Sequence, residues 1–396
     1  MGRLNGVPAE PADRNRPSVL FAINHLGRGG AESHTLRVLN YLDRTRYRPL
    51  LGVVARGGSY EDYLRPDVEI LELAHTSAQS STARQVMSAP GLRRLVVDRQ
   101  PDIVLLVMDF MAIIGTLTLK SLGPKRPKIV PVVQIPPSIE YASSAFGRRF
   151  VLPAIRRLYT RTDRVIALSH GVRDDLIGID ARLRNHITVI HNACVDDRTE
   201  NTTERVDVPT PDAPVILGAG RLITQKGFTY LIDAFAEVRR QTPAELWILG
   251  EGPDRSLLER RIAEHGLGSS VRLLGFQRAP HAFMRKSAIF CLSSIYEGFG
   301  NVVVEAMACG LPVVSTDCPY GPSEIIRDEN EGLLVPTRDV PALARSLARL
   351  LRDRPLRDRL AQSGLERAKN FHAAQVAREY ADEMDRIRAG SRRTTS

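Results

Sequence analysis

The fold is decided by residues 293–315, SSIYEGFGNVVVEAMACGLPVVS. Apolar residues directly before this stretch can complete a strand. Gly298 and Gly300 then favour a turn, because glycine adopts backbone angles that other residues avoid. Residues 302–308 are mostly apolar with no helix breaker, and residues 312–315 have the character of a buried parallel strand. The stretch therefore predicts a strand, a glycine turn, a helix and a second strand.

Two carboxylates bracket the turn, Glu297 and Glu305, with seven residues between them. Glu305 lies in an otherwise apolar helix, and a buried glutamate is costly unless it has a partner. The start of this helix leaves backbone N–H groups free, which suits an anion. These groups lie around Phe299, Gly300, Asn301 and Val302. Carboxylates beside an anion site favour a ligand with hydroxyls as well as phosphate, such as a sugar nucleotide. Taken alone, the carboxylate pair is explained equally well without a ligand. In that case Glu297 is a solvated turn residue and Glu305 is paired with an arginine.

Length and composition indicate a globular protein with an anionic partner. A chain of 396 residues suggests two domains of ordinary size, and 43% hydrophobic with 25% charged residues is typical of folded domains. The formal net charge of +10 suits a membrane surface, a nucleotide or a nucleic acid. The sequence contains no zinc finger, RNP-type aromatic run or dense basic tract, so we expect no nucleic-acid partner.

We expect a cytoplasmic chain that is soluble or peripheral to a membrane, at the inner face of the plasma membrane. The four cysteines form no CxxC pair, which favours reduced thiols. Residues 1–16 lack the apolar core of a signal peptide. The longest apolar run, at residues 103–119, is short and interrupted by Asp109, so it is not expected to span a membrane.

Apolar strands and helical stretches alternate along the chain. Strands are expected at residues 18–24, 50–54, 103–107, 129–133, 165–168, 215–219, 246–249, 271–274 and 288–292. The alternation predicts an α/β fold with two Rossmann-like, doubly wound domains that face each other across a cleft, the default ligand site. A glycine loop with Gly29 and Gly30 follows the first strand, and the polar residues 199–213 form the expected linker.

A basic loop at residues 220–227, GRLITQKG, leads from a strand into a helix. It places Arg221 and Lys226 beside a helix N-terminus, where the guanidinium fork, the ammonium and the helix dipole all favour a diphosphate. A single lysine at a helix start is otherwise usually only solvated. In the loop after the next strand, Gly250 and Gly252 allow the backbone to approach a ligand closely, although a plain tight turn also needs glycine.

Several segments together match a known family. They are GRLITQKG (220–227), GEGP (250–253) and EGFGNVVVE followed by AMACGLPVVSTD (297–317), with a looser match through GRGGAE (27–32), VIALSHGVRDDL (165–176) and VIHNACVD (189–196). With these segments the chain resembles the retaining glycosyltransferases of family 4, which have the GT-B architecture. The two glutamates of the family, seven residues apart, match Glu297 and Glu305.

The resemblance implies a role for each matching residue. Arg221 and Lys226 would hold the donor diphosphate and stabilise the leaving nucleotide, and Glu297 would bind hydroxyls of the donor sugar. These three residues are the expected catalytic group. Glu305 would accept hydrogen bonds from the ribose. The other expected donor-binding residues are Phe299, Gly300, Asn301, Val302, Gly250, Gly252, Gly29 and Gly30.

The resemblance also completes the predicted domain organisation. We expect a flexible tail at 1–16, an N-terminal, acceptor-side domain at 17–198, a linker at 199–213, a C-terminal, donor-side domain at 214–370, a helix that crosses back to the N-terminal domain at 371–390, and a tail at 391–396.

The implied reaction moves a hexose or N-acetylhexosamine from a nucleotide-diphosphate sugar to a glycan or lipid-linked acceptor. The sequence contains no DxD triplet, which fits GT-B enzymes in which arginine, lysine and helix dipoles replace a metal, so we expect no metal and no cofactor. Retention would follow same-face attack, with the leaving phosphate taking the acceptor proton. Residues 318–324, CPYGPSE, are similar to transferases of cell-surface polysaccharide and lipid-linked oligosaccharide assembly, which favours UDP over GDP.

The first half departs from the family pattern in one loop. Many relatives carry a histidine after the strand equivalent to residues 129–133, where this chain has QIPPS at residues 134–138. His170 and His191 follow later strands and can face the cleft, but a structural role fits each of them better. The resemblance therefore leaves open which N-terminal residue contacts the donor sugar.

A basic segment at residues 148–164 combines six arginines with apolar residues at helical spacing. A basic amphipathic helix can lie on an anionic membrane, while a packed domain helix with a solvated arginine face has the same pattern.

Two rival functions share the architecture. A GT-B enzyme could instead be a glycan phosphorylase or a sugar-nucleotide epimerase, but a phosphorylase needs a pyridoxal-binding lysine and the chain has only six lysines. A non-catalytic GT-B subunit that binds a sugar nucleotide or a partner protein would not need Glu297, Glu305, Arg221 and Lys226 all intact. The transferase interpretation is therefore preferred.

Overall fold

The computed structural model describes residues 16–27, 29–74, 81–200 and 207–390. Outside the described residues lie residues 1–15 of the predicted N-terminal tail, Arg28 of the glycine loop, residues 75–80, residues 201–206 of the predicted linker, and the predicted C-terminal tail at 391–396. Within the described part, no helix combines the length and apolar character needed to cross a membrane.

The first half of the chain forms a seven-stranded parallel sheet in the order β3-β2-β1-β4-β5-β6-β7. Its strands are β1 (Ser18–Ile23), β2 (Arg48–Val53), β3 (Glu69–Glu72), β4 (Ile103–Val107), β5 (Lys128–Val133), β6 (Val165–Ala167) and β7 (Ile187–Val189). Successive residues of β1 point to opposite faces, so Leu20 and Ala22 lie in one apolar core and Val19 and Phe21 in another. Burial on both faces accounts for the continuous apolar runs in the sequence.

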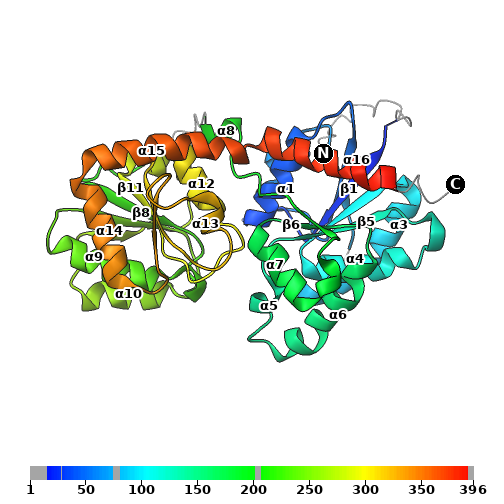
Figure 1. Cartoon of the computed structure of the whole chain (residues 1–396), viewed down its shortest axis with the longest axis horizontal. Coiled ribbons are helices and arrows are strands. Elements are labelled where there is room, and N and C mark those ends of the chain that lie inside the picture. The colour runs from blue at the N-terminus through cyan, green and yellow to red at the C-terminus, as the bar shows by residue number, and fades with distance from the viewer. Residues whose placement is uncertain (1–15, 28, 75–80, 201–206, 391–396) are drawn as a thin grey trace, which may run out of the picture.

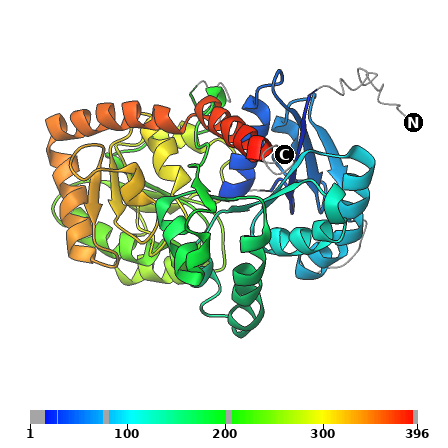
Figure 2. The same cartoon turned by 45° about the vertical axis from the view of Figure 1, so that its right-hand side comes forward.

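Helices cover both faces of this sheet (Figure 1). They are α1 (Gly30–Tyr41), α2 (Ser81–Met87), α3 (Ala89–Arg99), α4 (Asp109–Lys120), α5 (Pro137–Glu140), α6 (Leu152–Leu158) and α7 (His170–Ile179), with short 3-10 turns η1 (Glu61–Tyr63), η2 (Gly123–Lys125) and η5 (Ala181–Leu183). A π-helical turn, η3 (Gly147–Val151), precedes α6, and a 3-10 turn, η4 (Tyr159–Arg161), follows it. The segment with α5 and α6 projects from the lower edge of the domain in Figures 1 and 2.

The second half forms a six-stranded parallel sheet in the order β10-β9-β8-β11-β12-β13. Its strands are β8 (Val215–Ala219), β9 (Glu245–Leu249), β10 (Val271–Leu273), β11 (Ile289–Leu292), β12 (Val313–Thr316) and β13 (Leu333–Val335). Its helices are η6 (Thr224–Lys226), α9 (Phe228–Arg239), α10 (Arg255–Glu264), α11 (Pro280–Lys286), α12 (Asn301–Ala308), α13 (Pro322–Ile325) and α14 (Val340–Arg352). The stretch at residues 293–315 lies between β11 and β12, with α12 as its helix.

Two connections link the halves. The short helix α8 (Asp197–Glu200) leaves the first domain, so the chain is still helical in the first two residues of the predicted linker. The helices α15 (Arg354–Ala368) and α16 (Ala373–Gly390), joined by the turn η7 (Lys369–Phe371), run along the top of both domains in Figure 1. α16 packs on the first domain, where Tyr380 is buried in the core that holds Phe21 and its hydroxyl lies 3.0 Å from His34 Nε2.

The carboxyl ends of the two sheets face each other. In the first domain, Ser169 follows β6 and donates through Oγ to the carbonyl of Gly298, at 3.2 Å. Gly30 begins α1 after β1, and its carbonyl accepts from Asn301 Nδ2 at 3.3 Å. Gly298 and Asn301 both follow β11 of the second domain. The prediction of two doubly wound domains that face each other is therefore confirmed.

Candidate active site

Lys226 and Glu297 form the centre of the candidate site. Lys226 Nζ lies 2.6 Å from Glu297 Oε1, and Ser294 Oγ donates to the same oxygen at 2.6 Å. The Glu297 residue is only 6% exposed, so its carboxylate needs these partners. No other described side chain or backbone group donates to Glu297 Oε2. One oxygen of a buried carboxylate is thus held in place while the other can accept a hydroxyl.

The loop after β8 directs the lysine toward this carboxylate. A Cβ at Gly220 would lie 3.3 Å from both Cδ and Cε of Lys226, so the stem of the lysine lies across the glycine. The Arg221 side chain is exposed and makes no hydrogen bond or ion pair with any described residue. The loop that carries Lys226 therefore also carries a guanidinium that is available for a ligand.

Gly250 and Gly252 have a packing role in the structure. A Cβ at Gly250 would lie 1.8 Å from the carbonyl oxygen of Gly220, and one at Gly252 would lie 2.2 Å from that of Leu222. Leu222 N also donates to the Glu251 carbonyl at 2.9 Å. The loop after β9 therefore supports the loop that carries Arg221 and Lys226, which is sufficient reason for both glycines.

The glycine turn after β11 is fitted against the first domain. A Cβ at Gly298 would lie 2.1 Å from the Gln134 carbonyl oxygen, so no side chain fits there. Gly300 has φ 101° at the N-cap of α12, a conformation that favours glycine. Phe299 between them is buried and stacks on His191, with ring centroids 5.2 Å apart. Val302 is partly buried in the first turn of α12.

Asn301 connects the start of α12 to the first domain. Its Oδ1 accepts from Asn192 Nδ2 at 2.8 Å, in addition to the bond from its own Nδ2 to the Gly30 carbonyl. A Cβ at Gly30 would lie 3.1 Å from Asn301 Nδ2, and one at Gly29 would overlap the carboxylate of Glu32. The N-termini of α1 and α12 therefore lie close together with Gly30 at the contact, while Gly29 faces Glu32 of its own helix.

Glu305 is paired across the domain interface. Its Oε1 lies 3.5 Å from the guanidinium of Arg37, which also lies 3.4 Å from Asp196 Oδ2. Burial lowers the pKa of Arg37, but the carboxylates of Glu305 and Asp196 outweigh burial, so its pKa is raised and the side chain is charged. An arginine partner for the helix glutamate was one of the two alternatives that fit the carboxylate pair, and Arg37 is that partner in the structure.

Gln134 occupies the loop in which relatives carry histidine. It follows β5, is 6% exposed, and its Nε2 has no hydrogen-bond partner among the described residues. An unsatisfied buried amide is costly, and such groups need an explanation. Gln134 was not singled out as a site residue in the sequence, where its only signal is its position after a strand.

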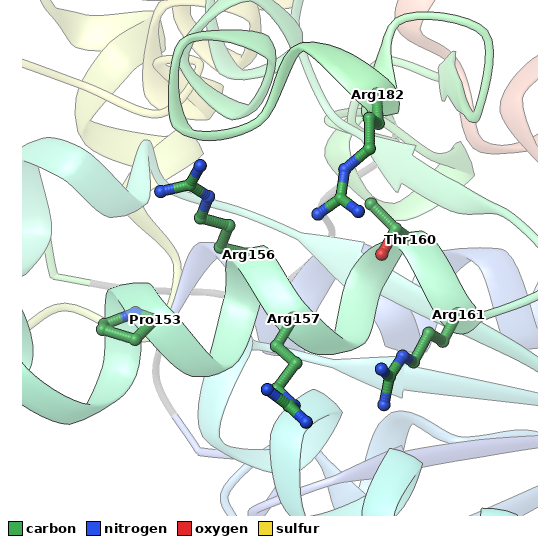
Figure 3. Close-up of a pocket in the computed structure, with 6 residues that line it drawn as sticks. All are labelled: Pro153, Arg156, Arg157, Thr160, Arg161 and Arg182. Carbon is green, nitrogen blue, oxygen red and sulfur yellow. The ribbon is translucent and has the colours of Figure 1, made fainter.

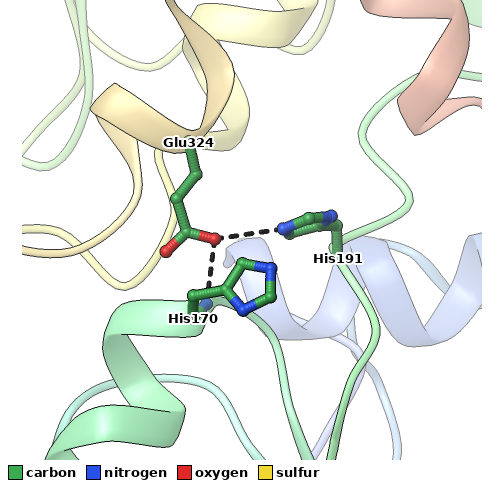
Figure 4. A group of neighbouring side chains, drawn as sticks. All are labelled: His170, His191 and Glu324. Atoms are coloured by element: carbon green, nitrogen blue, oxygen red, sulfur yellow. Dashed lines mark hydrogen bonds and ion pairs between the residues drawn. The ribbon is translucent and has the colours of Figure 1, made fainter.

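His170, His191 and Glu324 form a second polar cluster between the domains (Figure 4). Glu324 Oε2 accepts from His170 N at 2.8 Å and from His191 Nε2 at 3.1 Å, while Oε1 accepts from Gly171 N at 2.9 Å. The three side chains have atoms within 4.8 Å of one another that could hold a metal, the one such group in the described part of the chain. Two of the three hydrogen bonds to Glu324 come from backbone N–H groups at the start of α7. The cluster is therefore explained by a carboxylate of the second domain that caps a helix of the first.

The facing pair of Rossmann-like sheets defines the class of the protein, because known GT-B structures share it. Alr3699/HepE from Anabaena, solved in complex with UDP and glucose, is 22% identical, with a TM-score of 0.76 over 93% of this chain and 100% of that chain. Sucrose-phosphate synthase from Thermosynechococcus elongatus is 18% identical, with a TM-score of 0.78 over 95% of this chain and 100% of that chain.

Family models match both halves of the chain. Residues 28–198 match Glycosyltransferase Family 4, and residues 200–367 match Glycosyl transferases group 1. The chain belongs to this glycosyltransferase family, which confirms the resemblance.

Two curated relatives show which proteins the chain is similar to. The lipopolysaccharide core biosynthesis glycosyltransferase LpsE of Rhizobium meliloti is 34% identical over 52% of this chain and 59% of the relative. The N-acetylgalactosamine-N,N'-diacetylbacillosaminyl-diphospho-undecaprenol 4-alpha-N-acetylgalactosaminyltransferase of Campylobacter jejuni is 32% identical over 61% of this chain and 66% of the relative. The chain thus spans slightly less than two thirds of the length of each.

Proposed function

We propose that the chain is a retaining glycosyltransferase that moves a hexose or N-acetylhexosamine from a UDP-sugar to a glycan or lipid-linked acceptor in cell-envelope or polysaccharide biosynthesis. The observation that carries the proposal is the arrangement around Glu297. Its Oε1 is held by Lys226 and Ser294, and its Oε2 has no partner among the described residues. A carboxylate oxygen beside cations and a helix N-terminus suits a ligand with both hydroxyls and phosphates.

The names of the similar proteins support this choice of substrates. LpsE is named for lipopolysaccharide core biosynthesis, and the Campylobacter relative is named for a diphospho-undecaprenol acceptor. Alr3699/HepE has been solved with UDP-glucose. These names favour UDP as the nucleotide and a lipid-linked or envelope glycan as the acceptor.

The donor diphosphate would bind between the basic loop and the start of α12. An ammonium has three N–H donors, so Lys226 can keep one on Glu297 and direct the others at a phosphate. The Arg221 side chain can bind the same phosphate without first breaking an ion pair, since it has none with a described residue. Glu305 would accept from the ribose hydroxyls through the oxygen that does not face Arg37.

In the reaction, the bond between the sugar C1 and the phosphate oxygen breaks, and the electron pair stays on the departing UDP. Arg221, Lys226 and the amides of α12 stabilise this negative charge as it develops. The acceptor hydroxyl attacks C1 from the same face, and its proton moves to the departing phosphate oxygen. This route uses no metal and no cofactor, because the cations of the basic loop supply the charge stabilisation.

We place the enzyme on the cytoplasmic side of the membrane as part of the same proposal. A lipid-linked acceptor lies in the bilayer, and a basic chain would meet it from an anionic surface.

The test is release of UDP from a panel of UDP- and GDP-sugars, with membrane extract as the acceptor and EDTA present. We expect turnover of at least one UDP-sugar, and a loss of about a hundredfold in kcat/KM for Arg221→Ala and for Glu297→Gln. Arg239→Ala, an exposed arginine on α9, serves as the matched control and should behave as the wild type. Binding of the donor without turnover would favour a non-catalytic GT-B subunit, and equal behaviour of Arg221→Ala and the wild type would overturn the proposal.

A further inference from the structure

A basic helical rod stands out on the N-terminal domain, outside the candidate active site. The turn η3, helix α6 and turn η4 run without a break over residues 147–161. Between Glu140 and Asp163 the sequence contains five arginines and no acidic residue. Figures 1 and 2 show α6 at the projecting lower edge of the domain.

One side of the rod belongs to the core of the domain. Ile155, Leu158 and Tyr159 are buried, and the Tyr159 hydroxyl donates to Asp109 Oδ1 at 2.7 Å. These contacts fix the rod to α4 and to the apolar core of the domain. The opposite side is therefore not needed for packing.

The outward side of the rod carries aromatic residues at its beginning. Phe146 and Phe150 are 52% and 56% exposed, and their ring centroids lie 5.2 Å apart. Phe146 also stacks on Phe110 at 6.3 Å, which holds the pair in place. Large aromatic side chains this exposed are unfavourable in water and mark an interaction site when they cluster.

Arginines of the rod line a hollow of about 390 Å³, shown in Figure 3. This arginine hollow is lined by Pro153, Arg156, Arg157, Thr160, Arg161 and Arg182. Phe150 lies in η3 just before Pro153 at the start of α6, so the aromatic pair and the arginine hollow are neighbours along the rod. Arg182 reaches toward the rod from η5 (Figure 3).

The charge of the hollow is largely uncompensated. The side chains of Arg156, Arg157 and Arg161 make no hydrogen bond or ion pair with any described residue. Asp180 is hydrogen-bonded to Arg182, and these bonds, with a smaller contribution from the charge of Arg156, lower its pKa to about 2. Four guanidinium groups thus line the hollow with one carboxylate beside them, so the hollow favours an anion.

We propose that the arginine hollow and the pair Phe146 and Phe150 form one docking surface for the anionic phospholipid headgroups of a bilayer. Guanidinium groups bind phosphate oxygens in pairs, and exposed aromatic rings enter the boundary between headgroups and acyl chains. The rod has apolar residues at one end and cations along the rest of its length. This arrangement matches a layer of lipid headgroups better than it matches a free phosphate. The inference rests on the proposed function for its lipid-linked acceptor, which docking would bring to the enzyme.

The test is sedimentation of the full chain with vesicles of phosphatidylcholine alone and with 30% phosphatidylglycerol, about that fraction being typical of strongly anionic test membranes. We expect binding to the anionic vesicles only, which weakens as salt is raised. The triple variant Arg156→Gln, Arg157→Gln, Arg161→Gln should lower the partition coefficient by about a hundredfold, since each basic residue near the surface contributes roughly fivefold. Phe146→Ser with Phe150→Ser should weaken it independently.

The matched control removes three exposed arginines from the other domain, as Arg240→Gln, Arg345→Gln, Arg352→Gln, and should keep wild-type binding. Equal losses in the two triple variants, or equal binding to the uncharged vesicles, would overturn the proposal. The proposal would also be overturned if inorganic pyrophosphate abolished vesicle binding completely, because the hollow would then be a site for free phosphate. UDP binding measured on the same variants should not change. If the wild type does not bind UDP, the proposed function fails. If the wild type binds UDP but not the anionic vesicles, only the docking surface is contradicted.

Discussion

At the scale of single residues, the contact between Lys226 and Glu297 determines the character of the site. The two side chains meet at 2.6 Å, although 71 positions separate them in the chain. The ion pair offsets the cost of burying the Glu297 carboxylate. A ligand phosphate would share the lysine with this carboxylate, so the pair prepares the site and also limits how tightly the lysine can hold an anion.

Removal of the lysine should destabilise the protein through the carboxylate that remains. We expect Lys226→Ala to lower the free energy of unfolding by about 1–3 kcal/mol, because Glu297 loses its charged partner while staying mostly buried. Urea unfolding measures the change. The double variant Lys226→Ala, Glu297→Gln should recover part of this loss of unfolding free energy. If its loss equals the sum of the losses in the two single variants, the pair is not coupled.

Gly298 gives a second prediction at this scale. A methyl group there would lie 2.1 Å from the backbone of Gln134 in the other domain, so Gly298→Ala should force the domains apart. We expect a larger radius of gyration by small-angle X-ray scattering and a loss of UDP release, with the circular dichroism spectrum unchanged. Gly268→Ala, at a position with no atom within 4 Å of the added methyl, should change neither. A compact and active Gly298→Ala variant would contradict the description of this contact.

The sequence predicted some of these residues and missed others for a physical reason. Arg221, Lys226, Glu297 and Glu305 stand in loops and helices with a strong local pattern. The partner of Glu305 does not, because Arg37 lies in an ordinary helix and acquires its role only when two domains pack together. Local spacing contains no information on that packing.

At the scale of elements, the cap of α7 shows how the domains are held together. Ser169 accepts from Val172 N within the helix, and Glu324 from the other domain accepts from the backbone N–H groups of His170 and Gly171. A carboxylate at a helix N-terminus is also favoured by the helix dipole. The cap therefore contributes to the stability of the interface as well as the helix.

This cap predicts a dependence on pH. Burial raises the pKa of Glu324, but the hydrogen bonds from His191 and from the backbone outweigh burial and lower the pKa below its ordinary value of 4.5. The contribution of the ionised carboxylate is thus complete above pH 4.5 and is lost as the pH falls through the lowered pKa. Glu324→Gln should be less stable than the wild type at pH 7, and the difference in melting temperature should shrink toward pH 3.

The comparison of Glu324→Gln with the wild type isolates this group, since other acids titrate in both proteins. Glu366→Gln, at an exposed acid on α15, is the control and should show no such trend. A constant difference between Glu324→Gln and the wild type from pH 7 to pH 3 would contradict the cap.

The elements themselves were largely predictable from the sequence. Continuous apolar runs such as residues 103–107 and 129–133 marked buried parallel strands, and β4 and β5 have nearly those bounds. The π-helical turn η3 before α6 was not expected, because nothing in the local spacing distinguishes it from an α-helix. The rod packs on α4, a tertiary contact that local spacing does not reveal.

At the scale of the whole molecule, the C-terminal helices join the two domains. α15 packs on α12 of the second domain, and α16 is buried against α1 of the first. The helices that carry Gly30 and Asn301 at their starts are therefore held by one continuous segment of chain. This arrangement couples the position of the domains to the contact at the candidate site.

The docking surface and the candidate site lie in different parts of the molecule. The arginine hollow is on the first domain alone, while the basic loop with Arg221 and Lys226 belongs to the second. A membrane bound by the first domain would leave the donor side of the second domain free. We therefore expect donor binding and membrane binding to be separable.

Calorimetric titration with UDP in the presence of EDTA asks whether the cations of the protein alone bind the nucleotide diphosphate. We expect binding by the wild type, a decrease in affinity of roughly ten- to a hundredfold for Arg221→Ala from the loss of one charge-assisted contact, and no change for Arg239→Ala. Absence of UDP binding, or equal affinity in the wild type and Arg221→Ala, would contradict the proposed function.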